Sequence, residues 1–374
     1  MKKIVILLVA VACFAILASR QAKSEKAVLY LLNWGYYMDD ELIVRFEEEY
    51  DCEVKEILSE SNEDMYNQII NERYPIDVVI PSDYMIQKLR TANLLKPLNF
   101  DLIPNYQEDI FDDDLTSLIH EYDSSITDYA VPYFWGTVGL MYNDQTEGLE
   151  DVIKEHGYDV LFEPNLTSDS LRIGMYNNPR DSLGVAEIYL NKSLNTTSDE
   201  DLNACKDLLI EQKSKFKYVK YASDDLKSDI AGGKNLDVAV VYSGDFFDQY
   251  YVIEEEERDQ YINFYAPSVT NVYFDAMVIP TTSKETDLAH DFINFFLDSE
   301  VSYQNTEYVG YCPTLKSVYE MLLEDEYWNH LLTNYQFHPT KTINNTPSNG
   351  EMYKDLGDQV YGKMDELFRE IQAK

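Results

Sequence analysis

The chain has 374 residues, which is too long for one ordinary domain and suits two units of roughly 150 residues plus a leader. Its hydrophobic content of 45% and mean hydropathy of -0.37 are those of a soluble globular protein. The 68 acidic and 30 basic residues produce a formal charge of -38. This charge argues against nucleic acid as a partner and favours cations, although an acidic surface also simply keeps an exported protein soluble.

The N-terminus predicts export from the cytoplasm. Two lysines precede an apolar run over residues 4–18, the pattern of an export signal, so residues 1–26 are expected to be a signal peptide or lipoprotein leader. Cys13 stands in a small-residue context that resembles a lipoprotein cleavage site, while cleavage after Ala18 or an uncleaved anchor fits the pattern as well. We therefore expect an extracytoplasmic protein that contacts the membrane only through this segment or a lipid on it.

Strands and helices alternate in the first part of the mature chain. Residues 27–32 form a continuous apolar run typical of a buried strand, and an apolar stripe over residues 42–50 predicts a helix. Two more strands are predicted at residues 53–58 and 77–80, with a helix over residues 63–71 between them. This alternation predicts a parallel α/β sheet.

Aromatic and hydroxyl side chains follow two of these strands. Trp34 and Tyr37 come after the first strand, and Ser82 and Tyr84 come after the strand that ends at residue 80. Ligands of α/β sheets bind beyond the carboxyl ends of parallel strands, so these four side chains are expected to converge. The structural alternative is that Trp34 plugs the core under a loop and that Ser82 only caps a helix.

The second part of the chain repeats the α/β pattern. Strands are predicted at residues 171–175 and 236–242, and helices at residues 183–190 and 201–213. An acidic run over residues 254–257 is most simply a solvated helix end.

Asp275 is the most informative single residue because it lies inside a predicted strand. With a period of two it shares a face with Met277 and Ile279, and burying an unpaired carboxylate costs several kcal/mol. No Lys or Arg lies near it in sequence. A ligand ammonium is a natural partner, and a distant Arg or a helix N-terminus are the alternatives.

Motifs of enzymes, metals and cofactors are missing from the sequence. The cysteines that follow the leader, Cys52, Cys205 and Cys312, are scattered, and the five histidines form no HExxH cluster. There is no GxSxG elbow, and the turn at residues 232–234 lacks the spacing of a phosphate loop. We expect no metal, no cofactor and no catalytic activity.

A series of short motifs in fixed order resembles the spermidine/putrescine-binding proteins of bacterial polyamine importers. The similarity runs across nearly the whole mature chain. Its markers are Asn33-Trp34, Ser61 to Tyr66, Asp77 to Tyr84, Tyr129 to Gly136, Phe274 to Pro280 and Gly310 to Thr314.

The resemblance implies a type II periplasmic-binding-protein fold of the α/β class. It implies two lobes, each a mostly parallel sheet flanked by helices, with the ligand in the cleft between them. Lobe 1 would comprise residues 27–134 plus 275–312, and lobe 2 residues 135–274 plus 313–374. The expected function is capture of putrescine or spermidine and delivery to the membrane permease of an ABC importer, by a receptor that we expect to be a monomer.

The resemblance also implies which residues hold the polyamine. Aromatic walls would enclose the methylene chain, Asp275 and Asp181 would hold ammonium groups, and Ser82 would add a polar contact. The matching aromatic positions are Trp34, Tyr37, Tyr84, Tyr242, Tyr273 and Tyr311.

Departures from the family pattern bear on specificity. Asn178 stands where the spermidine receptor has an aspartate, and Tyr36 stands where it has a glutamate. The site therefore carries fewer negative charges, which favours putrescine or another organic cation as a candidate. The alternatives are a receptor of the same fold for another small organic ligand or ferric iron, and, with less support, an extracytoplasmic hydrolase.

Overall fold

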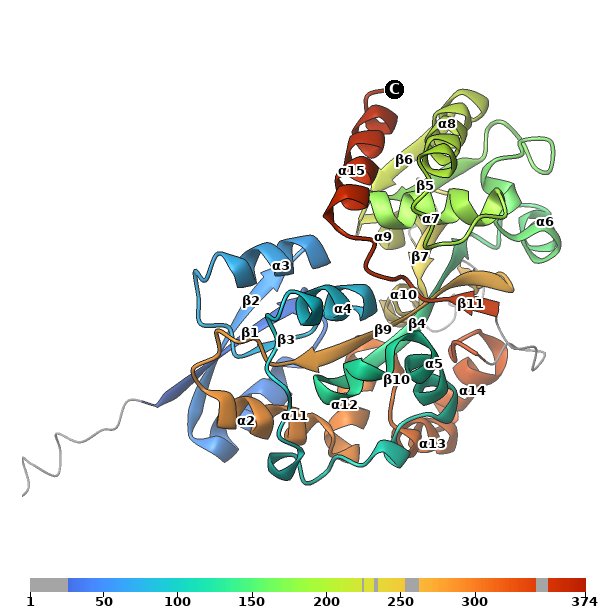
Figure 1. Cartoon of the computed structure of the whole chain (residues 1–374). Helices are drawn as coiled ribbons and strands as arrows, with labels where there is room; N and C mark the ends of the chain where they lie inside the picture. The colour runs from blue at the N-terminus through green and yellow to red at the C-terminus, as the bar shows by residue number, and fades with distance from the viewer. Residues whose placement is uncertain (1–25, 224, 232–234, 253–261, 341–348) are drawn as a thin grey trace, which may run out of the picture.

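The computed structural model describes residues 26–223, 225–231, 235–252, 262–340 and 349–374. Residues 1–25 of the expected leader, the turn at residues 232–234 and the acidic run at residues 254–257 lie outside these residues. Figure 1 shows two α/β units, one built around β1, β2 and β3 and the other around β5, β6 and β7. No described helix is both long and apolar enough to cross a membrane.

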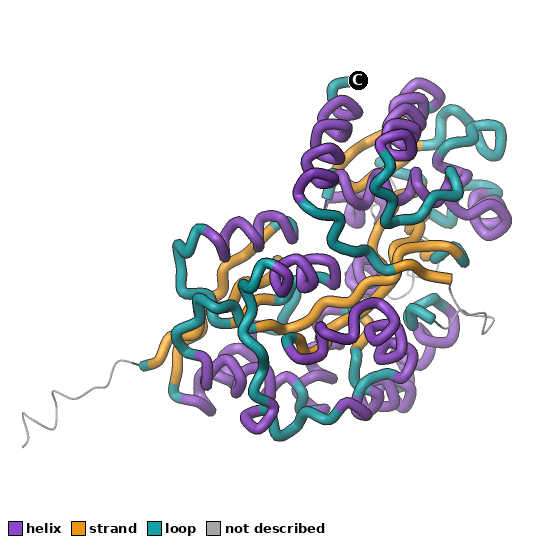
Figure 2. Tube along the Cα trace, in the orientation of Figure 1, coloured by secondary structure: helices purple, strands orange, loops and turns teal. Residues whose placement is uncertain are grey.

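The described strands connect in the order β2-β1-β3-β9-β4-β7-β5-β6, with β8 and β10 paired to β4 and β11 paired to β9. Helices lie on both sides of the strands in each unit (Figure 2). The strands are β1 (Ala27–Trp34), β2 (Cys52–Ser59), β3 (Val78–Val79), β4 (Ala130–Tyr142), β5 (Arg172–Tyr176), β6 (Tyr218–Ala222), β7 (Val238–Tyr242), β8 (Asn263–Tyr265), β9 (Val269–Val278), β10 (Cys312–Pro313) and β11 (Asn349–Glu351).

The α-helices alternate with strands in the first part of the chain, as expected. They are α2 (Asp40–Tyr50), α3 (Asn62–Ile70), α4 (Asp83–Thr91), α5 (Asp113–Asp123), α6 (Leu149–His156), α7 (Pro179–Tyr189), α8 (Asp199–Lys215), α9 (Asp225–Ala231), α10 (Ser243–Val252), α11 (Thr286–Phe296), α12 (Ser299–Val309), α13 (Lys316–Glu324), α14 (Glu326–Asn334) and α15 (Asp358–Gln372). By contrast, α7 and α8, α11 and α12, and α13 and α14 follow each other directly.

The sheet is mixed, whereas the alternation in the sequence predicted a parallel one. Within each unit the strands β1, β2 and β3, and β5, β6 and β7, pair in parallel. The long strands β4 and β9 pair antiparallel with each other, and β4 also pairs antiparallel with β7. Their direction is set by long-range pairing, which local apolar periodicity does not reveal. The predicted crossovers near residues 134 and 274 fall inside β4 and β9.

Local capping explains where several helices begin. The Asp39 side chain accepts a hydrogen bond from the backbone N–H of Glu41 at the start of α2, and Ser61 accepts one from Asp64 at the start of α3. The predicted helix at residues 183–190 begins four residues earlier, because Asn178 caps its first turn and Pro179 occupies the first helical position.

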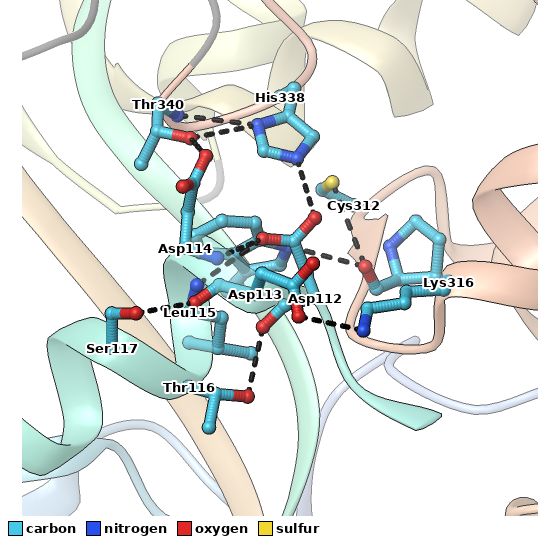
Figure 3. A network of polar contacts seen from close by, with 12 residues as sticks. Asp112, Asp113, Asp114, Leu115, Thr116, Ser117, Cys312, Lys316, His338 and Thr340 are labelled. Atoms are coloured by element: carbon cyan, nitrogen blue, oxygen red, sulfur yellow. Dashed lines mark hydrogen bonds and ion pairs between the residues drawn. The ribbon is translucent and has the colours of Figure 1, made fainter. Parts of the chain in front are cut away.

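A partly buried polar network joins residues 336–340 to the start of α5 (Figure 3). Asp112 caps α5, and its Oδ2 lies 3.1 Å from Nε2 of His338, whose side chain is almost fully buried. Thr340 donates its hydroxyl to Asp114 at 2.7 Å. This network fixes residues 338 and 340 at the N-terminus of α5, apart from the candidate site described below.

Candidate functional site

Asp275 lies in β9 and is buried among groups from three separate parts of the chain. It bridges to Ser82 at the start of α4, and the Tyr37 hydroxyl donates to its Oδ2 at 2.5 Å. The other oxygen, Oδ1, is also buried and has no hydrogen bond within the described residues. One acceptor of a buried carboxylate is therefore available to a ligand donor.

The surroundings of Asp275 make its ionised form costly. Burial removes water and raises the pKa of Asp275 from 3.8 to about 6, and the nearby hydroxyls of Ser82 and Tyr37 offset part of this rise. No cation of the described chain contributes to its pKa. The distant arginine that the sequence left as an alternative is thus not its partner. Its contacts are the Tyr37 hydroxyl and Ser82, the N-cap of α4, so the helix N-terminus does lie beside it.

Asp181, in the first turn of α7, is the second predicted carboxylate. Its Oδ2 accepts hydrogen bonds from Asn178 Nδ2 at 2.5 Å and from the Tyr242 hydroxyl at 2.6 Å. Burial raises the pKa of Asp181, while the hydrogen bonds from Tyr242 and Asn178, the charge of Arg180 and a contact from Tyr353 offset part of the rise. This carboxylate is far better satisfied by the protein than Asp275 is.

A third carboxylate, Asp245, joins the site and was not predicted from the sequence. Its Oδ1 accepts from the Tyr311 hydroxyl at 3.1 Å, and its Oδ2 accepts from the Tyr176 hydroxyl at 2.6 Å. Asp245 lies in the first turn of α10, directly after β7. The same reasoning that selected Ser82, a polar residue just beyond a strand end, would have found it.

Tyrosine rings connect the three carboxylates. The rings of Tyr37 and Tyr311 meet edge to face with centroids 5.0 Å apart, and those of Tyr242 and Tyr273 do so at 5.1 Å. Tyr176 lies 4.9 Å from Tyr242. Ring faces and carboxylates thus alternate through the site, an arrangement suited to an organic cation.

Two glycines let these rings approach the backbone. A Cβ atom on Gly244 would lie 1.9 Å from Cδ2 of Tyr311, and one on Gly136 would lie 2.4 Å from the hydroxyl oxygen of Tyr273. Any side chain at either position would push a site tyrosine out of place. The glycines are therefore part of the construction of the site.

The remaining predicted residues lie at its margins. Tyr84 donates its hydroxyl to Glu63 at 3.1 Å, and its ring meets Tyr353 edge to face at 6.3 Å. Trp34 is half-buried and donates from Nε1 to the Ile80 carbonyl at 2.8 Å, which supports the loop before Ser82. Its ring also packs against both of the clusters of buried apolar side chains that form the core. These contacts are those expected from the structural alternative, in which Trp34 fills the core under a loop.

Metal chemistry finds no support in the described part of the chain. No group of three or more His, Cys, Asp or Glu side chains there has the arrangement of a metal site. Cys52, Cys205 and Cys312 are buried and lie in different parts of the fold.

Comparison with known proteins identifies the class. Residues 41–333 match the model of the family described as bacterial extracellular solute-binding protein. A solved structure titled "Putative spermidine/putrescine ABC transporter from Listeria monocytogenes" superposes with a TM-score of 0.74 and 31% identity, covering 93% of this chain and 99% of that one. The fold is thus the α/β periplasmic-binding-protein fold, as predicted.

The chain belongs to the bacterial extracellular solute-binding protein family, whose members are receptors of transport systems rather than enzymes. It is 26% identical over 294 residues to the putrescine-binding periplasmic protein SpuD of Pseudomonas aeruginosa, covering 77% of this chain and 78% of that protein. It is 24% identical over 370 residues to the spermidine/putrescine-binding periplasmic protein of Escherichia coli, covering 98% and 97%. The predicted family is confirmed.

Proposed function

We propose that the protein is the polyamine-binding receptor of an ABC importer, acting outside the cytoplasm. The observation that carries this proposal is the state of Asp275: a buried carboxylate with hydroxyl partners, no cation of its own and one oxygen without a hydrogen bond. An ammonium group supplies the missing charge and donor together. Such charge-assisted hydrogen bonds contribute about 1.5–3 kcal/mol each.

The rest of the site suits the other parts of a polyamine. Tyr273 is in the field of both Asp275 and Asp245, and its ring meets that of Tyr242 edge to face, so it would bind the methylene groups between the two ammonium positions. The second ammonium would bind at the opposite wall, where Asp245 and Asp181 are joined through Tyr242 and Tyr176. Each cation–π contact adds about 0.5–2 kcal/mol.

Entry of the ligand requires movement. Asp275, Tyr37 and Tyr273 are each at most 6% exposed, so a ligand reaches them only when the two units separate. Hinge closure around a ligand is the general behaviour of two-unit receptors, and we infer it here.

Ferric iron is a poorer ligand for this site. Iron would require tyrosine oxygens as phenolates, but burial raises the pKa of Tyr37 and Tyr311 well above the usual value and favours the protonated form. Both hydroxyls already donate to carboxylates.

Isothermal titration with putrescine, spermidine and a panel of sugars and amino acids tests the assignment. We expect heat with at least one polyamine, a dissociation constant near or below micromolar, and none with sugars. The absence of heat with both polyamines would reject the proposal.

The membrane permease of the importer is the proposed protein partner. Periplasmic relatives support an extracytoplasmic location, and the lipid anchor at Cys13 stays a prediction on residues outside those described. Labelling of the expressed protein with radioactive palmitate, compared with a Cys13→Ala variant, would decide whether the anchor exists.

A further inference from the structure

We propose that Arg180 is a positioning residue that holds the polyamine site closed by joining the two units, without contacting the ligand. This inference rests on the proposed function. Arg180 adjoins Asp181 in the first turn of α7 and is 5% exposed. Sequence reasoning gave it no role.

The contacts of Arg180 come from both units. Its Cζ atom lies 4.2 Å from the ring centroid of Tyr353 and 6.0 Å from that of Tyr84 at the start of α4. Nη2 donates to Asn195 Oδ1 at 3.0 Å and to the Lys354 carbonyl at 3.4 Å. The guanidinium thus connects α7 and the segment before α15, both of the second unit, to Tyr84 of α4 in the first unit.

The charge of Arg180 is buried without a direct counterion. All its hydrogen-bond partners in the described chain are neutral, and its Nε atom is buried and has no partner there. Burial raises the pKa of both Asp83 and Asp181, two buried carboxylates from different units, and the charge of Arg180 offsets part of each rise. Arg180 is thus a buried cation beside acidic groups of both units, while Lys227 lies 3.9 Å from Asp245 elsewhere in the site.

Other contacts also join α4 to the start of α15 and to the segment before it. Lys88 forms an ion pair with Asp358 at 2.7 Å, and the backbone N–H of Asp355 donates to Gln87 Oε1 at 2.9 Å. These contacts are at the surface or partly exposed, so they contribute little by themselves. Arg180 is the most deeply buried of these residues that join the two units.

Arg180→Met tests whether Arg180 holds the units together, because methionine keeps an apolar side chain of similar length but removes the charge and the hydrogen-bond donors of the guanidinium. Putrescine binding would be followed by stopped-flow fluorescence, and closure by the ligand-induced decrease in radius of gyration in X-ray scattering. We expect the dissociation rate to rise at least tenfold, the association rate to stay within about twofold, and the compaction to shrink. Arg180→Lys, which keeps the charge alone, should recover part of both losses.

Arg172→Met is the matched control, because Arg172 is a partly buried arginine of the same unit that pairs with Asp237 away from the site. It should lower the melting temperature and leave the dissociation rate and compaction unchanged. Wild-type rates and compaction in a folded Arg180→Met protein would overturn the proposal while leaving the proposed function intact. Absence of polyamine binding by the wild type would instead reject the proposed function.

If Arg180→Met does not fold, Asn195→Ala takes its place. This variant keeps the arginine and removes the side-chain acceptor of Nη2. The dissociation rate should then rise two- to fivefold with reduced compaction, and a wild-type rate would overturn the proposal.

Discussion

At one end of the site, Asp275 accepts a hydrogen bond from Tyr37 and keeps a buried oxygen without a partner. At the other end, Asp181 accepts from Asn178 and Tyr242 and lies under the field of Arg180. Both are buried aspartates, but the protein compensates Asp181 more fully, because the charge of Arg180 acts on it in addition to its hydrogen bonds. The difference indicates that a ligand cation matters most at Asp275, and that Asp181 mainly shapes the opposite wall.

The sharpest way to break this comparison is to neutralise each carboxylate in turn. Asp275→Asn should weaken putrescine binding about 10- to 100-fold, because it removes a charge-assisted hydrogen bond with no substitute. Asp181→Asn should weaken it about fivefold or less, since the protein already satisfies that group. Titration calorimetry measures both, with Asp237→Asn as a control far from the site. An equal or larger loss at Asp181 would contradict the asymmetry.

The pH dependence of putrescine binding should reflect the titration of Asp275. The pKa of Asp275 in the empty protein is raised from 3.8 to about 6, so below pH 6 an ammonium ligand must displace a proton. Putrescine affinity should therefore fall about tenfold between pH 7.5 and pH 5 and be accompanied by proton release.

Calorimetry in two buffers of different ionisation enthalpy measures that release. The Asp275→Asn variant is the control, because its affinity should change less over the same range. An equally steep pH dependence in this variant would assign the titration to another group.

Removal of a single hydroxyl should have a smaller effect. Tyr37→Phe deletes the 2.5 Å hydrogen bond to Asp275 and should weaken putrescine binding roughly two- to tenfold. It should also move the pH midpoint of binding upward, because that hydrogen bond lowers the pKa of Asp275. Tyr158→Phe, which removes a buried hydroxyl that bonds to Val138 and Thr270, is the matched control. An unchanged affinity for Tyr37→Phe would count against Asp275 as the ammonium ligand.

Glu187 is a buried carboxylate outside the site, so its substitution should change the stability of the protein and leave the affinity for putrescine unchanged. Both of its oxygens lack hydrogen bonds in the described structure, and burial raises its pKa from 4.5 to about 7. The cost of ionising it is absent below pH 4.5, grows as the pH rises and is complete above pH 7. Glu187→Gln should therefore stabilise the protein at pH 8, by on the order of 1–3 kcal/mol, and have no such effect at pH 4.5.

Thermal melts at the two pH values measure this difference, and titration with putrescine verifies that affinity is unchanged. Equal stabilisation at both pH values would show that ionisation of Glu187 is not the cause.

Much of the local structure follows from the sequence because it depends on neighbours along the chain. The apolar run at residues 27–32 becomes β1, which extends two residues further, and the stripe over residues 42–50 becomes most of α2. The predicted placement of Asp275 inside a strand is confirmed, since apolar residues on both sides determine it. These properties require only periodicity and burial.

The family and its fold were also determined by the sequence, through motifs in fixed order. Only the tertiary structure decided that β4 and β9 run antiparallel, that Asp245 joins the site through Tyr311 and Tyr176, and that Arg180 lies beside Tyr84 and Tyr353. Each of these depends on residues tens to hundreds of positions apart. Their meeting is set by strand pairing and the packing of two units, which no local pattern encodes.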